Sequence, residues 1–222
     1  MKLLIVAISA VMLSACATAP TEPEVTFDGL VQVPDTRLEK VYRLPGADLS
    51  GYVEFGLAPC EVSFRKNWLR DQNRSNINLT NRVTQDDVNR IRDALAEECT
   101  TYFREALLEA PAYNLVEDFE NGQDVLVIKP AIIDLDINAP DVRSAGMARN
   151  YTTSAGEMTL SLELVDGTTG QVLVRVVDQQ EDRDSYRLEW TNSVSNRAEA
   201  RRVLGMWSER LRKGFDAATA SQ

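Results

Sequence analysis

The stretch MTLSLELVDGTTGQVLVRVV, residues 158–177, decides the fold class. Apolar and polar side chains alternate through residues 158–164, as in a strand with one buried face. Residues 172–177 are rich in valine, a strong strand former, and the intervening DGTTG, residues 166–170, is a strong turn signal. The stretch therefore predicts an antiparallel β-hairpin over residues 157–178.

Two further segments predict the rest of a sheet. Residues 52–64 alternate in two short runs and predict a first strand, in which Pro59 requires an edge position or a bulge. Residues 124–137 begin with a run that is apolar on both faces, as in a central strand, and Pro130 predicts a bulge within it. The polar residues 65–83 between the first strand and the next element predict a long loop.

Two amphipathic segments predict long helices. The first begins after Thr84, which can cap it, and ends before Pro111. Its apolar residues recur at steps of three and four: Val88, Ile91, Leu95, Cys99, Tyr102 and Ala106. The second covers residues 196–215, with the apolar stripe Ala200, Leu204, Trp207, Leu211 and Phe215 among many arginines.

We interpret the second helix as packed on the sheet with a solvated basic face, rather than lying on an anionic membrane surface, because the sheet needs its apolar stripe as cover. Residues 51–222 are therefore predicted to form one α+β domain, a mixed sheet with two long helices packed on it.

The first sixteen residues predict the compartment. Lys2 precedes an apolar run over residues 3–13, which fits a signal peptide and is shorter than the roughly 20 residues of a membrane-spanning helix. Leu13-Ser14-Ala15-Cys16 then resembles the lipobox of bacterial lipoproteins. The resemblance implies removal of a lipoprotein signal peptide, residues 1–15, and acylation (palmitate and related chains) of Cys16. Ala17 in place of Asp favours, by the same resemblance, the outer membrane with the domain facing the periplasm.

Residues 16–50 are predicted to be a lipidated, flexible tether and a lead-in to the domain. The first part has two prolines and no hydrophobic period, so it should be extended. Pro34, Pro45 and Gly46 are expected to prevent any regular element in the lead-in.

Composition excludes several functions. The 222 residues include 24 Lys and Arg, 34 Asp and Glu, and no His, which gives a net charge of −10. Without histidine there is no Ser-His-Asp or Cys-His catalysis and no His-ligated zinc. The acidic balance argues against nucleic-acid binding.

Cys60 and Cys99 are the two cysteines that remain once Cys16 is lipidated. In an oxidising periplasm they predict a disulfide, with two buried free thiols as the alternative.

Asp134 and Asp136 lie two residues apart in a predicted strand, with Glu157 and Glu163 on a neighbouring strand. We read these four carboxylates as a polar strand face rather than as an acid–base pair or a calcium site.

The predicted loops carry arginines and aromatic residues, the composition of protein-recognition surfaces. Ordinary solvated loops are the alternative, and a recognition role requires that these side chains be at least partly exposed on one side of the domain. The candidate partner-binding residues are Trp68, Arg70, Arg143, Arg149, Tyr151 and Trp190.

From about Tyr52 onward the chain resembles a family of bacterial lipoproteins known only as domain of unknown function 3313. The lead-in DLSGY (residues 48–52), the helical YFREAL (102–107), the strand 124–137, the segment ELVDGTTGQVL (163–173) and Trp207 with Leu211 carry this resemblance. It implies localisation and fold but no chemistry.

Three functions stay open. The leading hypothesis is a non-catalytic envelope lipoprotein that binds an envelope protein, a cell-wall component or a membrane component through its loops, without a metal or cofactor. A hydrolase using the acidic residues is the second. A carrier of a small apolar ligand between sheet and helices is the third, and a cavity of at least about 300 Å³ would favour it.

Overall fold

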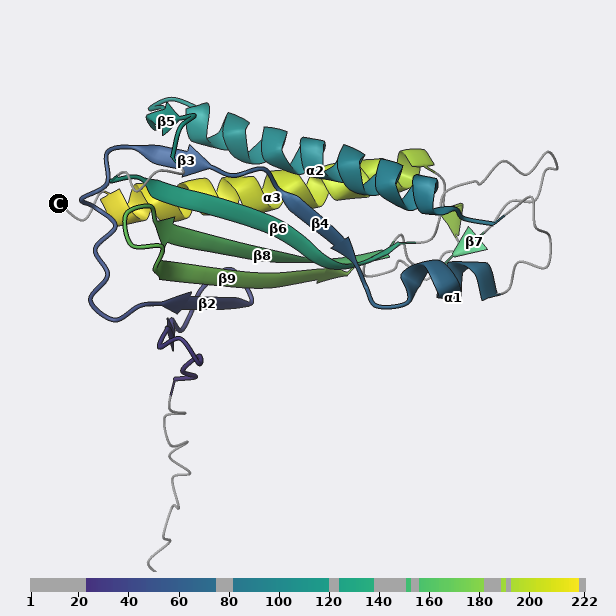
Figure 1. Cartoon of the computed structure of the whole chain (residues 1–222), viewed down its shortest axis with the longest axis horizontal. Coiled ribbons are helices and arrows are strands. Elements are labelled where there is room, and N and C mark those ends of the chain that lie inside the picture. Colours follow the sequence, from purple (N-terminus) through teal and green to yellow (C-terminus); the bar gives the residue numbers. More distant parts are fainter. Residues whose placement is uncertain are drawn as a thin grey trace, which may run out of the picture.

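The computed structural model describes residues 23–219 apart from residues 75–81, 120–123, 138–150, 153–155, 182–188 and 191–192. Eight strands form one mixed sheet, and two long helices, α2 (Gln85–Leu108) and α3 (Ser193–Thr219), lie side by side along one face of it (Figure 1). The expected α+β architecture is confirmed. No helix within the described residues is long and apolar enough to span a membrane.

The sheet combines antiparallel and parallel pairs. Its strand order is β1 (Val31–Gln32), β2 (Lys40–Arg43), β9 (Val172–Glu181), β8 (Gly156–Asp166), β6 (Leu126–Ile137), β3 (Phe55–Leu57) and β5 (Leu115–Val116), with β4 (Glu61–Phe64) also paired to β6. The β3–β5, β3–β6 and β4–β6 pairs are parallel, and the other pairs of this sheet are antiparallel. A separate two-stranded ribbon joins β7 (Tyr151–Thr152) to β10 (Glu189–Trp190).

The predicted hairpin is confirmed as β8 and β9. The carboxylate of Asp166 accepts a hydrogen bond from the backbone N–H of Thr169 at 2.6 Å, and the N–H of Gly170 donates to the Asp166 carbonyl at 2.8 Å. Gly170 has a φ of 73°, a left-handed conformation that a glycine adopts without a steric penalty. This local chemistry explains why the sequence alone identified the turn.

The bulge expected at Pro130 lies elsewhere. Pro130 keeps its place in the ladder opposite Leu162, and the register shifts between Ile133 and Asp136, where Asp134 has a φ of 52°. Pairing of β3 with β6 ends at Ile128, and pairing of β4 with β6 begins at Ala131. Pro130 thus falls at an interruption between two strands, where its missing N–H costs no ladder bond.

The lead-in segment does contain regular structure, contrary to expectation. β2 pairs with β9 over Val174–Val177, and β1 pairs with β2 at the edge of the sheet. Leu30 and Tyr42 are buried. The prolines were expected to prevent this, but they flank the two short strands, and the outer edge of β9 offers unpaired backbone groups to whatever segment covers it.

The predicted loop over residues 65–83 contains a short helix, α1 (Trp68–Arg74). The predicted first long helix is confirmed as α2, and Thr84 caps it in a capping box with Asp87. Its buried side chains are Leu95, Cys99, Phe103 and Leu107, so the stripe runs in steps of four rather than through Tyr102 and Ala106. Together with Val203, Leu204, Trp207 and Phe215 of α3, they form one core with the inner face of the sheet.

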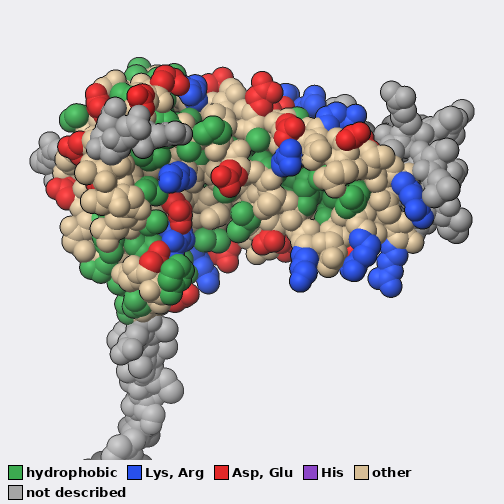
Figure 2. All heavy atoms as spheres, viewed as in Figure 1, with side chains coloured by type: hydrophobic (Ala, Val, Ile, Leu, Met, Phe, Trp, Pro, Cys, Tyr) green, Lys and Arg blue, Asp and Glu red, His purple; other side chains and the backbone are tan. Residues whose placement is uncertain are grey.

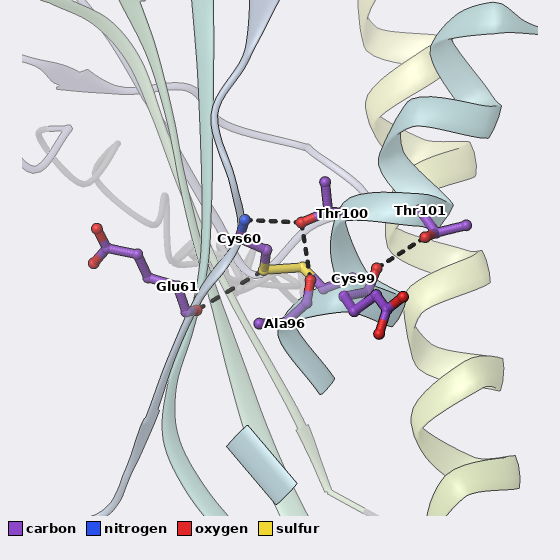
Figure 3. The surroundings of a disulfide bond; sticks show 7 residues. Cys60, Glu61, Ala96, Cys99, Thr100 and Thr101 are labelled. Atoms are coloured by element: carbon purple, nitrogen blue, oxygen red, sulfur yellow. Dashed lines mark hydrogen bonds between the residues drawn. A yellow bond between two sulfur atoms is a disulfide. The ribbon is translucent and has the colours of Figure 1, made fainter. Parts of the chain in front are cut away.

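The predicted disulfide is confirmed (Figure 3). Cys60, just before β4, is bonded to Cys99 of α2, with the two Cα atoms 6.0 Å apart. Beside it, the Cys60 N–H donates to the Thr100 hydroxyl at 3.0 Å, and that hydroxyl donates to the Ala96 carbonyl at 2.8 Å. The alternative of two free thiols is thereby excluded.

Candidate functional site

An apolar cleft of about 520 Å³ opens between the C-terminal half of α3 and the β2 side of the sheet. Its floor is formed where neighbouring strands align Leu162, Val176 and Val41 in one row, and Leu164 and Val174 in the next. The other apolar lining side chains are Leu38 and Leu49, from the segments on either side of β2, and Leu211, Phe215 and Ala218 of α3.

Gly214 keeps the helical wall of this cleft open. It lines the cleft within one apolar stripe of α3, and a Cβ at position 214 would meet no atom within 4 Å. Glycine inside a helix costs about 1 kcal/mol relative to alanine, so this position gives up helix stability where the cleft needs room.

The charged residues that line the cleft are all basic: Arg37, Arg210 and Lys213. Arg210 forms an ion pair with Asp178 at 3.5 Å, and Lys213 forms one with Glu209 on the preceding turn of α3. Lys213 is the main cause that lowers the pKa of Glu209, and Arg37 adds a smaller electrostatic effect in the same direction. Arg210 acts on Glu209 in the same direction, so all three cations that line the cleft favour the charged form of this carboxylate.

Asp178 fixes the walls of the cleft to one another. Its side chain is buried and accepts hydrogen bonds from the indole N–H of Trp207 at 2.7 Å and from the backbone N–H of Glu39 at 2.8 Å. One carboxylate on β9 thus holds both α3 and the residue that leads into β2. Because a buried charge must be paired and hydrogen-bonded, this arrangement keeps the cleft's frame rigid.

The prediction that Trp68 is at least partly exposed is wrong. Only 2% of its surface is exposed, its indole N–H donates to the Ile137 carbonyl at 2.8 Å, and its ring lies 4.3 Å from that of Phe64. The polar composition around Trp68 predicted a loop, but α1 begins at this residue and turns its ring onto β4 and the end of β6. Trp68 is a core residue and makes no partner surface.

Arg70 is exposed, as a recognition role would require. Its side chain is 71% exposed, and with Asn73, Arg74 and Arg82 it lines an open polar hollow of about 610 Å³. Lys and Arg side chains gather toward the α1 end of the face in Figure 2.

Cys16, Arg143 and Arg149 lie outside the described residues. The backbones of Tyr151 and Trp190 pair in the β7–β10 ribbon, and their side chains lie outside the described part.

Of the four carboxylates weighed for catalysis, Asp136 and Glu157 lie opposite each other across the β6–β8 pair, but each of the two has its own partner. Asp136 pairs with Arg65, Glu163 pairs with Arg175 at 2.8 Å, and Glu157 accepts a hydrogen bond from Gln179. The bulge at Asp134 interrupts the alternation on which a shared face with Asp136 depended. Among the described residues, no three acidic, cysteine or histidine side chains group as metal ligands would.

Sequence reasoning missed the cleft and its basic mouth. Two signals in the sequence point toward it: the alternating KVYR of residues 40–43, which reads as a strand, and Gly214 within an otherwise apolar helical stripe. Neither signal shows that residues 37–49 and 210–218 line the same cleft. These two segments are far apart in the sequence, and only the pairing of β2 with β9 brings the first of them to the cleft.

The solved structures to which this chain is similar share little sequence with it and have low TM-scores. The PelC dodecamer from Paraburkholderia phytofirmans is 9% identical, with a TM-score of 0.38 over 77% of this chain and 95% of that one. A neuraminyllactose-binding hemagglutinin homologue from Helicobacter pylori is 9% identical, with a TM-score of 0.34 over 79% of this chain and 88% of that one. No curated protein matches the sequence.

One family model, described as protein of unknown function (DUF3313), matches residues 25–211. The match begins well before Tyr52, where the resemblance was expected to start, and so includes β1 and β2, which form the outer edge of the sheet. Since the match covers most of the 222 residues, the chain belongs to the DUF3313 family.

Proposed function

We propose that this protein is a lipid-anchored envelope protein whose domain binds the apolar part of a ligand in the cleft beside α3 without transforming it. The single observation that carries the proposal is the cleft of about 520 Å³ with its almost continuous apolar lining. This volume falls in the range of about 300–1,000 Å³ typical of small-molecule sites. It favours the carrier hypothesis over recognition through the loops alone.

The physical chemistry of the lining supports binding. Protein interiors are normally filled, and apolar walls left open to water lose the contacts that packing would supply. A hydrocarbon chain placed there would gain about 0.8 kcal/mol per buried CH₂ before the costs of association.

The lining supports no acid–base or nucleophilic chemistry. Its polar side chains, among the described residues, are Thr36 and the three basic residues. The Thr36 hydroxyl donates to the Leu38 carbonyl at 2.8 Å, and Lys213 is paired with Glu209, so the two are not arranged as a nucleophile and its base. This is why we propose a binding domain rather than a hydrolase.

The location belongs to the same proposal. The segment Leu13-Ser14-Ala15-Cys16 supports a lipid on Cys16, and Ala17 supports the outer membrane, with the domain in the periplasm. The disulfide is consistent with such an oxidising compartment.

A partner surface at the α1 end remains a second proposal, supported by the exposed Arg70 and the arginine-lined hollow beside it. Cross-linkers placed in vivo at positions 70, 149 and 190 should capture one common envelope partner. If the three positions capture nothing in common, this surface is not a site.

The cleft is tested with N-phenyl-1-naphthylamine, an uncharged dye whose fluorescence rises in apolar sites. The mature chain is exported behind a cleavable signal without a lipobox, so it carries no lipid and needs no detergent. The core of the described chain runs from Leu30 to Phe215, so this chain keeps every core residue.

The wild-type chain should bind the dye, and Gly214→Leu should weaken binding at least about tenfold by filling the cleft. Gly205→Ala is the matched control in the same helix, because its Cβ would make an ordinary contact of 3.7 Å with the Tyr102 ring and lies away from the cleft. If the wild type does not bind the dye, or if Gly214→Leu binds it equally well, the proposed function is wrong.

A further inference from the structure

We infer that the ligand is a fatty acid, whose single hydrocarbon chain lies in the cleft beside α3 and whose carboxylate meets Arg37 and Lys213 at the mouth of the cleft. This inference rests on the proposed function and adds the chemical class of the ligand. The observation behind the inference is that one cleft combines an apolar lining with three basic side chains.

The charge at the cleft opposes that of the whole protein. The chain has a net charge of −10, yet each charged residue that lines the cleft is basic. Of the acids nearby, Asp178 is buried, the side chain of Glu209 is 65% exposed, and the exposed Asp35 and Glu39 flank Arg37 in the chain. A local positive charge in an acidic protein attracts an anionic group to the cleft's mouth.

Two of the three cations are available to a ligand. Arg210 is engaged by the buried Asp178 and serves the protein itself. Among the described residues, Lys213 forms an ion pair with Glu209 alone, and both side chains are more than half exposed. Such a surface pair on one helix contributes about 0.3–0.5 kcal/mol, so its ammonium group can turn to a ligand. Arg37 forms no ion pair with any of the described residues.

The polar groups at the mouth match a compact anionic head. Arg37 can donate two parallel hydrogen bonds to a carboxylate, and Lys213 can add a third charged donor. Besides the three cations, Thr36 supplies the only polar side chain among the described lining residues. A glycerol or sugar head would need further partners for its hydroxyls, whereas a carboxylate needs only donors.

The size of the cleft favours a single hydrocarbon chain. Its volume of about 520 Å³ lies in the lower half of the range of ligand sites, about 300–1,000 Å³. A lipid with several chains would have to leave most of its apolar surface in water.

The test uses three ligands with the same ten-carbon chain and different heads: decanoate, decanol and decyltrimethylammonium. Each competes with N-phenyl-1-naphthylamine for the lipid-free mature chain at neutral pH. Decanoate should compete best, and raising the salt concentration should weaken decanoate alone, because salt screens charges at exposed sites.

The charge-removing variant Arg37→Gln with Lys213→Gln should weaken decanoate at least about tenfold, or about 1.4 kcal/mol, and leave decanol within twofold. The matched control is Arg92→Gln with Lys129→Gln, which removes two exposed cations, one on α2 and one on the outer face of the sheet. This control should bind decanoate like the wild type.

The outcomes separate the two ideas. If the dye and decanol do not bind the wild type, the proposed function fails and the inference fails with it. If they bind but decanoate is insensitive to loss of Arg37 and Lys213, or if decyltrimethylammonium binds as well as decanoate, only the inference fails. Tighter binding of a decanoyl lysophospholipid than of decanoate would also overturn it, because the head would then be a phosphate.

Discussion

Arg212 shows how a charged residue in a surface-like pattern can belong to the core. Its guanidinium donates to the carbonyls of Ala106 at 3.0 Å, Glu109 at 2.7 Å and Pro111 at 2.7 Å, and lies 4.8 Å from the centre of the Tyr113 ring. The last carbonyls of a helix have no partner within it. One side chain from α3 therefore satisfies the end of α2, and the expectation of a wholly solvated basic face on α3 is wrong at this position.

Arg212→Ala should lower the free energy of unfolding by about 3 kcal/mol, because it leaves three carbonyls without their charged donor. Arg212→Lys should recover little, since one ammonium group cannot reproduce the fork of the guanidinium. Urea denaturation of each variant measures the effect. Arg202→Ala, which removes an exposed arginine paired with Glu199 on the same helix, is the control and should cost no more than about 1 kcal/mol.

Between elements, two links join segments that are distant in the sequence. The disulfide joins the start of β4 to the middle of α2, across 39 residues. On the outer face of the sheet, Arg175 of β9 pairs with Asp28 at 2.7 Å and with Glu163 of β8 at 2.8 Å. Asp28 belongs to the segment before β1, so this second link attaches the beginning of the domain to its central hairpin.

Loss of the disulfide should reduce stability substantially. Closing a loop of this length stabilises a protein by roughly 4 kcal/mol in the chain-entropy model. The double variant Cys60→Ala with Cys99→Ala should therefore unfold at a lower urea concentration than the oxidised protein, and reductant should not change it further. Alkylation of two thiols in protein purified without reductant would contradict the bond.

The Asp28 link should make stability depend on pH in the acid range. Hydrogen bonds from Arg175 and Thr26 lower the pKa of Asp28 from 3.8 to about 2 in the folded state. A carboxylate with a lowered pKa contributes stability above its unfolded pKa, near 4, and this contribution is lost as the pH falls toward 2.

Urea midpoints measured at about pH 6 and about pH 2.5 should therefore differ less in Asp28→Asn than in the wild type. Glu181→Gln, at an exposed carboxylate of the same strand β9, is the control and should behave like the wild type. Equal losses in Asp28→Asn and the wild type would show that this ion pair carries none of the acid sensitivity.

At the scale of the whole molecule, the cleft and the α1 end lie in different places. The described chain begins beside β1 and β2, and α1 lies at the opposite end of the sheet (Figure 1). The cleft opens along the β2 side, near that beginning. If Cys16 carries the lipid, the chain leads from the membrane to the β1–β2 edge of the sheet, and the cleft lies along this edge on the face that carries α3.

Cys16→Ala should abolish lipidation and release the protein from the membrane fraction, because one thiol carries the predicted anchor. Fractionation of cells, followed by mass spectrometry of the N-terminal peptide, measures both effects. Cys60→Ala with Cys99→Ala keeps Cys16 and should stay in the membrane fraction. Unchanged membrane association of Cys16→Ala would show that something other than the lipid holds the protein there.

The sequence by itself determined the elements whose signals are local. The DGTTG turn between alternating runs specified the hairpin, Thr84 specified the start of α2, and the count of cysteines together with the predicted compartment specified the disulfide. The hairpin and the start of α2 depend on side chains within a few residues of each other. For the disulfide, only two cysteines remained after Cys16, so the sole alternative was two free thiols. The α+β architecture followed, because two amphipathic helices must cover the sheet that the strands form.

Only the tertiary structure decided which surfaces remain free. Trp68 is buried because α1 turns it onto β4, and Arg212 is buried because the end of α2 lies beside it. The cleft exists because β2 joins the edge of β9 and brings Arg37 and Leu38 opposite Gly214. Burial and cavities depend on contacts between segments far apart in the chain, and periodicity within one segment carries no information about its neighbours in space.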